Sequence, residues 1–318
     1  MDTLLIVFAV IIILFIAVCL GGGIGMFCYA LKRPKKGPDP MTMDDYSAHM
    51  NPFMDFLKAE KQWLFSTGYD EVEITSFDGL ELKGILVYAP EKSKKTVIAI
   101  HGYKNCGINE YSSYIRNNHE MGFNVLVPDD RAHGKSEGKF IGFAWLDRRD
   151  CIDWIKFAVN KFGEDSSVLL HGISMGSATV MNASGESDLP KQVKAIVSDC
   201  GYSCAWDQFK HVLKRNFHLH SFPVLYVANV INKLINKYDF KENSSVNQVK
   251  KASVPFLFIH GGDDDFVPTE MVHEVYNACA SIQKEVHVFE GAAHAESYYV
   301  CHDEYLKVLR NFINKIDF

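Results

Sequence analysis

The sequence predicts an α/β fold in which helices cover both faces of a mostly parallel central sheet. Between residues 96 and 289, short and almost wholly apolar segments alternate with segments of helix length. Continuous apolar strands are typical of parallel sheets, whose strands are buried on both faces. The chain has 318 residues, of which 47% are hydrophobic, and this is enough for one large domain. Its net charge of −6 gives no electrostatic reason to expect nucleic acid as a partner.

Residues 1–33 are predicted to form an N-terminal transmembrane helix. No charged residue occurs at positions 4–31, and about 20 apolar residues are enough to cross a bilayer. A cleaved signal peptide is the alternative, but such a leader starts with basic residues, and none precedes this apolar run. Four basic residues follow at 32–36, so the positive-inside rule predicts a single-pass membrane protein whose large C-terminal part is cytoplasmic. Gly21 and Gly25 form a GxxxG pattern, which can pack two membrane helices together.

The folded domain is expected to occupy residues 61–318. The preceding residues, 34–60, contain several prolines and few large aliphatic side chains, and they are expected to be a linker. The domain then opens with two antiparallel strands, 71–76 and 80–88, which alternate in polarity around the turn dipeptide at 78–79.

The alternating part of the chain is expected to contribute six parallel strands, at 96–100, 124–127, 167–170, 193–198, 255–259 and 285–289. Helices between them are expected to begin near Tyr111, Phe143, Ser174, Thr269 and Asp303. One connection is unusual, since about 50 residues separate the fourth and fifth of these strands, against a usual loop of about 4–6 residues. Its middle is apolar with mostly helical spacing, so an insertion at about 202–250 is expected to form a helical cap over an active site.

Ser174 is the candidate nucleophile. It lies at the centre of the Gly-x-Ser-x-Gly motif at 172–176, with an apolar strand before it and a helix-forming segment after it. A serine hydroxyl is a weak nucleophile at neutral pH and needs an adjacent histidine base. The two glycines of the motif allow the sharp strand-to-helix turn that exposes the hydroxyl. This context predicts a serine hydrolase.

An acid and a base are then expected to follow in chain order, each just beyond the end of a strand. The strand at 255–259 leads to three consecutive carboxylates, Asp263–Asp265, and one of them is expected to orient the histidine. Asp199, beyond the preceding strand, is a further candidate for the acid. From position alone, these alternatives stay open.

His294 is the candidate base, because the last strand leads into the small-residue loop at 291–295 that contains it. The neighbouring histidines His273, His287 and His302 lie in regular elements, from which an imidazole has less freedom to reach the edge of the sheet.

Two backbone N–H groups are expected to stabilise the oxyanion of the tetrahedral intermediate. One is that of Met175, directly after the nucleophile, and the other is that of Tyr103, in the loop after the first parallel strand. His101 begins this loop and is expected to make a structural hydrogen bond behind it.

These residues resemble the α/β-hydrolase superfamily, and specifically bacterial single-pass membrane serine hydrolases of the YqkD-like and serine-aminopeptidase-like branch. The resemblance covers about residues 70–316 and depends on segments 101–103, 130–138, 172–176, 260–268 and His294. The family pattern is His-Gly, two residues, Asp, two residues, Val-Pro, and it implies that the acid is Asp264. Ala132 stands where the family often has glycine.

The resemblance implies an α/β-hydrolase fold and cleavage of a small-molecule ester or acyl substrate by a Ser-Asp-His triad, through an acyl-enzyme. A peptidase or amidase of the serine-aminopeptidase type would use the same triad, and a non-catalytic membrane scaffold is the alternative from another class. No cofactor and no metal site is expected, since no metal-binding spacing or phosphate-binding loop occurs. The apolar residues of the insertion either line a pocket for an acyl chain or pack the cap onto the sheet: Phe217, Phe222, Leu225, Tyr226, Ile231 and Leu234.

Overall fold

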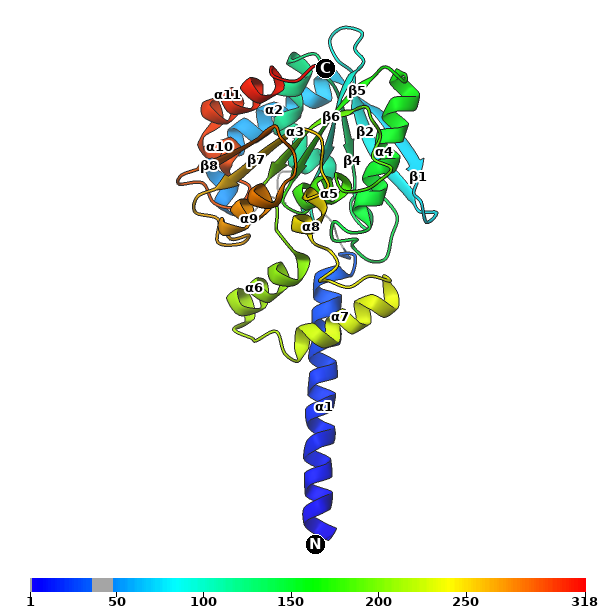
Figure 1. The fold of residues 1–318 in the computed structure, drawn as a ribbon, viewed down its shortest axis with the longest axis vertical. Helices are drawn as coiled ribbons and strands as arrows, with labels where there is room; N and C mark the ends of the chain where they lie inside the picture. The colour runs from blue at the N-terminus through cyan, green and yellow to red at the C-terminus, as the bar shows by residue number, and fades with distance from the viewer. Residues whose placement is uncertain (1, 36–47) are drawn as a thin grey trace. The chain divides into compact units, whose positions relative to one another are not determined.

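The computed structural model describes residues 2–35 and 48–318, which divide into two compact units (Figure 1). The larger unit contains Arg33–Ser203 and Ser244–Phe318. The smaller unit contains the residues up to Lys32 together with Cys204–Asn243. The insertion expected from the sequence therefore belongs to the same unit as the N-terminal apolar helix.

The larger unit is built on an eight-stranded sheet with the strand order β1-β2-β4-β3-β5-β6-β7-β8. The strands are β1 (Asp70–Thr75), β2 (Glu81–Val87), β3 (Lys95–Ile100), β4 (Asn124–Pro128), β5 (Ser167–Ile173), β6 (Val193–Asp199), β7 (Phe256–Gly261) and β8 (Lys284–Phe289). β2 pairs antiparallel with β1 and β4, and all the other pairs are parallel. The predicted α/β-hydrolase fold, with its antiparallel start and mostly parallel sheet, is confirmed.

Helices cover both faces of this sheet (Figure 1). α2 (Met54–Thr67), α3 (Gly107–Glu120), α10 (Ser297–Val300) and α11 (His302–Ile313) pack on one face, where their side chains share a core with alternate residues of the strands. α4 (Asp147–Phe162), α5 (Met175–Ala183), α8 (Ser245–Val249) and α9 (Glu270–Ala278) contact one another in turn on the other face. The central strands are buried along their whole length because both sets of alternate side chains are covered.

The helix expected to start at Phe143 begins four residues later, at Asp147. Phe143 and Ala144 have φ values of 50° and 65°, which a right-handed helix does not allow. The Asp147 carboxylate accepts a hydrogen bond from the backbone N–H of Ala144 at 2.7 Å, so the turn is closed by the first residue of the helix. The helix was predicted to begin too early because the apolar residues of this turn fit a helical pattern.

The linker expected at 34–60 is too long. Residues 36–47 lie outside the described part of the chain, but from Ala48 onward the chain forms a 3₁₀ turn (Ala48–Phe53) and then α2. Leu57 and Leu64 of α2 are fully buried, and the Lys61 ammonium donates to Asn109 of α3 at 3.1 Å. The folded domain therefore includes residues that composition alone had assigned to the linker.

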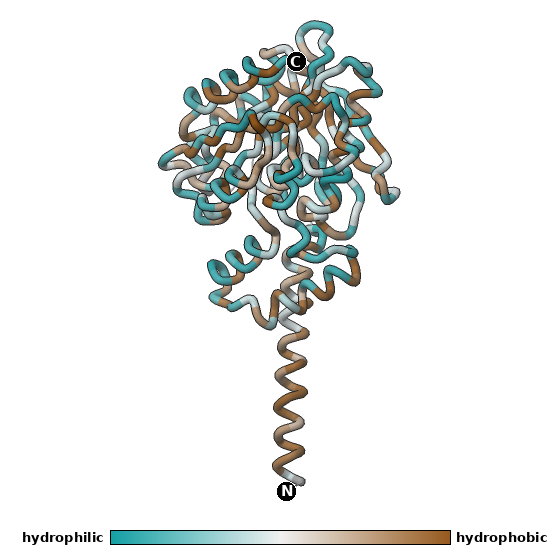
Figure 2. The backbone as a smooth tube through the Cα atoms, in the orientation of Figure 1, coloured by the Kyte–Doolittle hydropathy of each residue, from teal (hydrophilic) through white to brown (hydrophobic). Residues whose placement is uncertain are grey.

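The smaller unit consists of α1 (Asp2–Leu31), α6 (Ala205–Phe217) and α7 (Val224–Ile235). Residues Thr3–Leu31 form a helix long and apolar enough to cross a membrane, and this helix is brown over most of its length in Figure 2. α7 crosses α1 at Gly22 and Gly23 (Figure 1). A Cβ atom on Gly23 would lie 2.3 Å from Cγ1 of Val227, so only glycine permits this contact.

The helical character of the insertion agrees with the expectation, but its apolar residues are used differently. α7 packs against α1, with Leu225 fully buried. Phe217 places its ring edge-on to Tyr29 of α1, at 5.4 Å between ring centroids. Phe222 and Leu234 are each 68% exposed.

Candidate active site

Ser174 occupies a strained turn between β5 and α5. Its φ of 56° lies in the left-handed region, which an L-residue with a side chain adopts only when its surroundings impose it. A Cβ on Gly172 would lie 2.2 Å from the carbonyl oxygen of Gly176, and one on Gly176 would lie 1.9 Å from that of Ile100. Both glycines are therefore needed for the backbone to turn here, which leaves the Ser174 side chain at the end of the strand.

The structure brings Ser174, His294 and Asp264 together from three separate parts of the chain. The Nε2 atom of His294 lies 2.9 Å from the Ser174 Oγ, and its Nδ1 atom lies 2.7 Å from the Asp264 Oδ2. Asp264 follows β7 and His294 follows β8, so the carboxyl ends of adjacent parallel strands position the three groups. The His294 side chain is 20% exposed, whereas the Asp264 side chain is fully buried.

Asp264 is held as an acceptor of several hydrogen bonds. Its Oδ1 accepts from the backbone N–H groups of Phe266 and Val267, at 3.0 and 2.8 Å. Its Oδ2 lies near both His294 and the Nε2 of His260, the latter at 3.2 Å. Burial by itself would raise the pKa of Asp264, but the hydrogen bonds and charges of His260 and His294 outweigh it and hold the pKa well below its usual range. The carboxyl is therefore ionised throughout the neutral range.

The structure also places the three alternative acids. Asp263 and Asp265 are exposed, unlike the aspartate between them. Asp199 is buried at the end of β6 and accepts a hydrogen bond from the Tyr305 hydroxyl at 2.9 Å. Burial raises the pKa of Asp199 to about 6. Among the four candidates, Asp264 is the one whose carboxylate receives the imidazole of His294.

The alternative histidines lie in regular elements, as expected. His273 is exposed on α9, His287 lies in β8 beside Glu285, and His302 begins α11. His260, at the end of β7, contributes in a way that the sequence reasoning did not identify. Its Nε2 is shared between the Val267 carbonyl, at 2.9 Å, and Asp264. The His-Gly pair directly before the acidic loop was the available signal for this second partner of the acid.

The loop after β3 lies next to the nucleophile and is fixed by two buried histidines. A Cβ on Gly102 would be 3.3 Å from the Cβ of Ser174, so the backbone here passes close to the serine. His101 accepts a hydrogen bond from the backbone N–H of Asp130 at 2.9 Å, and its other nitrogen lies 2.7 Å from the Gly102 carbonyl. The Nε2 of His133 accepts the backbone N–H of Lys104 at 3.0 Å.

Tyr103 lies between the two points where this loop is fixed. The N–H of Gly102 donates to Glu110 at 3.0 Å, so this amide is already used inside the loop. Burial is the main cause that keeps the pKa of His133 well below its usual value, and the nearby His101 adds to it. His133 therefore stays neutral and can accept a hydrogen bond from the Lys104 N–H. Met175 is the first residue of α5, where backbone N–H groups have no partner within the helix.

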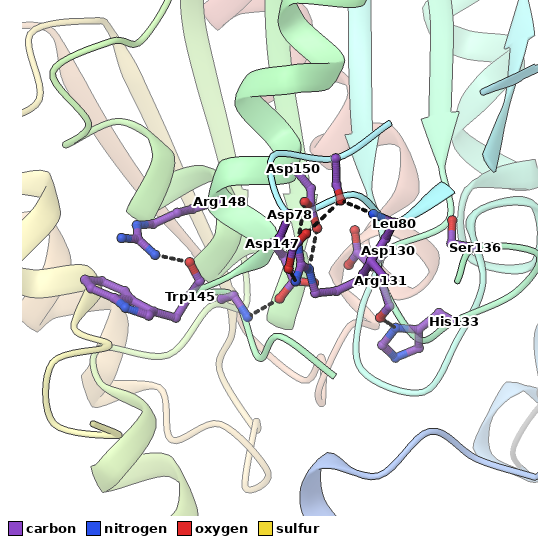
Figure 3. A network of polar contacts seen from close by, with 12 residues as sticks. Asp78, Leu80, Asp130, Arg131, His133, Ser136, Trp145, Asp147, Arg148 and Asp150 are labelled. Atoms are coloured by element: carbon purple, nitrogen blue, oxygen red, sulfur yellow. Dashed lines mark hydrogen bonds and ion pairs between the residues drawn. The ribbon is translucent and has the colours of Figure 1, made fainter. Parts of the chain in front are cut away.

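Arg131 anchors the segment that carries His133 (Figure 3). Its guanidinium makes two 2.6 Å hydrogen bonds to Asp150 of α4 and two more, at 2.9 and 3.0 Å, to Asp78 in the β1–β2 turn. The Arg131 and Asp150 side chains are 3% and 5% exposed, so this bidentate pair is shielded from solvent, whereas the Asp78 side chain is 40% exposed. The loop of Tyr103 is thus connected through His133 to a rigid, charge-paired network.

The arrangement defines a class of chemistry. A serine in contact with a histidine, which in turn contacts a buried carboxylate, is the arrangement of an acyl-transfer site. Among residues 2–35 and 48–318, no group of three or more His, Cys, Asp or Glu side chains is placed to hold a metal ion. The fold and the comparisons below identify the protein as an α/β-hydrolase enzyme.

The chain belongs to the family described as serine aminopeptidase, S33, which it matches over residues 91–246 and 242–296. The uncharacterized protein YqkD of Bacillus subtilis is 28% identical over 254 residues, which are 78% of this chain and 82% of YqkD. Protein bem46 of Schizosaccharomyces pombe is 20% identical, over 80% of this chain and 79% of its own. Among solved structures, the Pyrococcus furiosus esterase Pf2001 is similar with a TM-score of 0.64 and 25% identity, over 79% of this chain and 93% of the esterase.

Proposed function

We propose that the protein hydrolyses carboxylic esters by a Ser174–His294–Asp264 triad, through an acyl-enzyme. The observation that carries this proposal is the position of His294, whose two ring nitrogens lie 2.9 Å from the serine hydroxyl and 2.7 Å from the buried carboxylate. A structural role for this histidine would not require an acceptor on one side and a hydroxyl on the other. The presence of all three groups in contact also argues against a non-catalytic scaffold, which would not need them.

The contacts of Asp264 determine the direction of proton transfer. Because the ionised carboxylate can only accept, His294 carries its proton on Nδ1 and presents a bare Nε2 to the hydroxyl of Ser174. Nε2 takes the hydroxyl proton as Oγ attacks the ester carbonyl, and it returns that proton to the leaving alcohol. Water then repeats both transfers on the acyl-enzyme and releases the carboxylic acid.

The oxyanion that forms in each step needs preorganised donors. We assign this role to the backbone N–H groups of Met175 and Tyr103. Met175 follows the nucleophile at the start of α5, and Tyr103 lies in the fixed loop beside Ser174. Removal of one such donor typically costs about 10²–10³ in kcat.

Esters are proposed ahead of amides because the solved relative with 25% identity is an esterase. The family description keeps a peptidase or amidase as the second candidate, since the same triad can act on the poorer leaving group. Matched p-nitrophenyl esters and aminoacyl p-nitroanilides compare the two directly. A higher kcat/KM on the anilides would reverse this order.

The apolar helix α1 is proposed to be an uncleaved single-pass anchor with the hydrolase domain on the cytoplasmic side. The four basic residues after the helix support this orientation under the positive-inside rule. A signal sequence is the alternative, and the mass of the protein recovered from membranes decides between the two. Protease digestion of intact and broken cells tests the orientation. The insertion Cys204–Asn243 is proposed to act as the cap of this domain.

Labelling with a fluorophosphonate probe tests the central claim, because the probe reacts only with an activated serine. We expect labelling of the full-length protein to be lost in Ser174→Ala. Ser177→Ala is the matched control, since Ser177 lies one position beyond the motif and its hydroxyl contacts Ser198. Labelling that persists in Ser174→Ala would remove this serine from the mechanism.

A further inference from the structure

The smaller unit places apolar surface beside a helix that is itself long enough to cross a membrane. We propose that α7 and the turn before it lie in the lipid headgroup region of the bilayer, in contact with phospholipid. This inference rests on the proposed role of α1 as a membrane anchor. The insertion would then be an interfacial element, as well as a cap.

The exposure of α1 shows where the membrane would end. From Thr3 to Gly22 every described side chain is exposed except that of Cys19, and these residues span roughly 30 Å of helix. That length equals the hydrocarbon thickness of a typical bilayer, about 30 Å. Beyond this point the helix has a buried stripe, formed by Gly23, Met26, Phe27, Ala30 and Leu31. α7 meets α1 at Gly22 and Gly23, which is the level at which the bare segment ends.

α7 itself has the polarity expected of a helix that faces lipid. Its inner side contains Asn229 and Asn232, which are 9% and 0% exposed, and Asn232 donates to the Tyr238 carbonyl at 2.7 Å. Its outer side contains Val230 and Leu234, which are 57% and 68% exposed. A water-facing helix would place the amides outside and the aliphatic side chains inside. Leu225 and Ala228 are buried, but Val230 and Leu234 stay exposed, so their apolar surface leaves water only if something covers the outer side, and we assign that role to lipid.

The length of α7 excludes a second membrane crossing. Twelve residues extend about 18 Å, which is well short of the hydrocarbon thickness. A short helix with one apolar face normally lies in the plane of the interface. The aromatic residues Phe222 and Tyr226 are exposed on and just before its first turn, as is common at the boundary between lipid and water.

The charge of the insertion fits an anionic lipid surface. Residues 204–243 contain six Lys or Arg residues and three Asp or Glu residues, although the whole chain has a net charge of −6. Lys237 lies exposed just beyond α7, and Lys233, exposed on α7, also pairs with Asp239 at 3.3 Å. Basic residues near a membrane surface are attracted by anionic headgroups, by about 1 kcal/mol each.

A cavity in the same unit is also suited to hydrocarbon. It has a volume of about 180 Å³ and lies between α1 and the insertion. Its lining comes from Gly22, Gly25, Met26, Tyr29, Leu213, Phe217, Leu219 and Val224. A water molecule needs polar partners in a cavity, and this lining offers only the Tyr29 side chain and backbone groups. An acyl chain or lipid tail matches the lining.

Depth-dependent fluorescence quenching tests this placement in the full-length protein. A nitrobenzoxadiazole probe is attached to Val230→Cys, in vesicles of equal phosphatidylethanolamine and phosphatidylglycerol that contain lipids with a nitroxide near the headgroup or near the acyl end. Lys210→Cys, on the polar outer side of α6, is the matched control. Ile12→Cys reports on the anchor, and Leu234→Cys provides a second position on α7. The background replaces the accessible cysteines Cys19, Cys28, Cys204 and Cys301 with serine.

We expect the Val230 and Leu234 probes to emit at shorter wavelength than the Lys210 probe, and to be quenched severalfold more by the shallow nitroxide. The Ile12 probe should be quenched most by the deep nitroxide. Quenching at Ile12 without quenching at Val230 or Leu234 would overturn the interfacial placement and leave the anchor intact. A blue-shifted but unquenched Val230 probe would instead identify a second copy of the chain as the cover and refute lipid contact. No quenching at Ile12 would refute the anchor, and the interfacial placement with it.

Discussion

The substitution Asp264→Asn should abolish most of the activity while leaving the fold intact. The introduced amide keeps its oxygen towards the N–H groups of Phe266 and Val267, because the reverse orientation would place donors against donors. Its NH₂ group then faces the Nδ1 of His294. That nitrogen must accept a hydrogen bond, so the ring proton moves to Nε2. Nε2 can then no longer take the proton of Ser174.

The size of the effect follows from this change of tautomer. Loss of the correct tautomer in a serine-histidine site lowers kcat by about 10⁴-fold, which corresponds to about 5.5 kcal/mol of transition-state stabilisation. KM should change little, because Asp264 is buried behind His294 and does not contact the substrate in the proposed mechanism. In the unmodified enzyme the low pKa of Asp264 keeps it ionised, so Asp264 should contribute no ionisation to kcat/KM between about pH 5 and 8.

Hydrolysis of a p-nitrophenyl ester by the full-length protein in detergent measures both constants. Asp263→Asn and Asp265→Asn are the matched controls, since both residues are exposed neighbours in the same loop, and each should keep kcat within a few-fold of the original. Asp199→Asn provides the third comparison, because Asp199 is the other buried carboxylate among the four candidates for the acid. A tenfold or smaller loss in Asp264→Asn, or an equal loss in Asp199→Asn, would refute the assignment of the acid.

Three further substitutions test the framework of the site in the full-length protein, two by thermal melting and one by folded yield and probe labelling. Asp199→Asn should raise the free energy of unfolding by up to about 3 kcal/mol at pH 8 and by about half of that at pH 5. The pKa of this carboxyl is raised to about 6 in the folded protein from an unfolded value near 4, so its ionisation destabilises the fold as the pH rises through this range. An equal gain at both pH values would contradict this. Gly176→Ala should lose both folded yield and probe labelling, since its Cβ would meet the carbonyl of Ile100 at 1.9 Å, and a stable, labelled variant would show that this turn can relax. Arg131→Met should lower the free energy of unfolding by about 3–5 kcal/mol, because it leaves Asp150 buried without its partner. The double variant Arg131→Met with Asp150→Leu should recover much of that loss.

Most of the sheet could be predicted because each strand carries its own signal. The strand that precedes Ser174 is buried at every position, so it appears in the sequence as an uninterrupted apolar segment. The start of α4 and the helix α2 were missed for a different reason. Phe143 and Ala144 look helical by composition, yet their backbone is set by a turn that Asp147 closes. In α2, polar residues are as numerous as apolar ones, and its place in the fold depends on contacts with α3, such as that of Lys61 with Asn109, 48 residues further along the chain.

The site was predictable to the extent that the topology of the fold constrains it. Parallel strands bring their carboxyl ends to one edge, so a serine, an acid and a histidine after three such strands must lie near one another. The choice among Asp263, Asp264 and Asp265 depended on the family pattern, because composition does not show which of three adjacent loop residues is buried. His260 was not identified, because the His-Gly pair marks its position but does not show that its ring contacts Asp264.

The orientation of α7 could not be predicted from its sequence. Read as a helix in water, the segment from Val224 to Ile235 would expose Asn229 and Asn232 and bury its aliphatic side chains. The structure buries both amides together with Leu225 and Ala228, and leaves Val230 and Leu234 exposed. The amides are buried because they bond the chain that follows the helix: Asn229 accepts the backbone N–H of Phe240 at 2.8 Å, and Asn232 donates to the carbonyl of Tyr238. Only the contact partners reveal which side of such a helix faces outward.

The insertion is attached to the larger unit at one closed junction. It leaves the larger unit after Ser203 and returns at Ser244, and its two ends are joined by a hydrogen bond from the N–H of Ala205 to the carbonyl of Asn243 at 2.9 Å. In the larger unit, the N–H of Val246 donates to the Ser203 carbonyl at 3.2 Å, so the junction is closed on that side as well. A segment whose ends already meet can change in length and sequence at little cost to the domain that carries it. The positions of Ser174, Asp264 and His294 depend on β5, β7 and β8, whereas the insertion can vary independently of them.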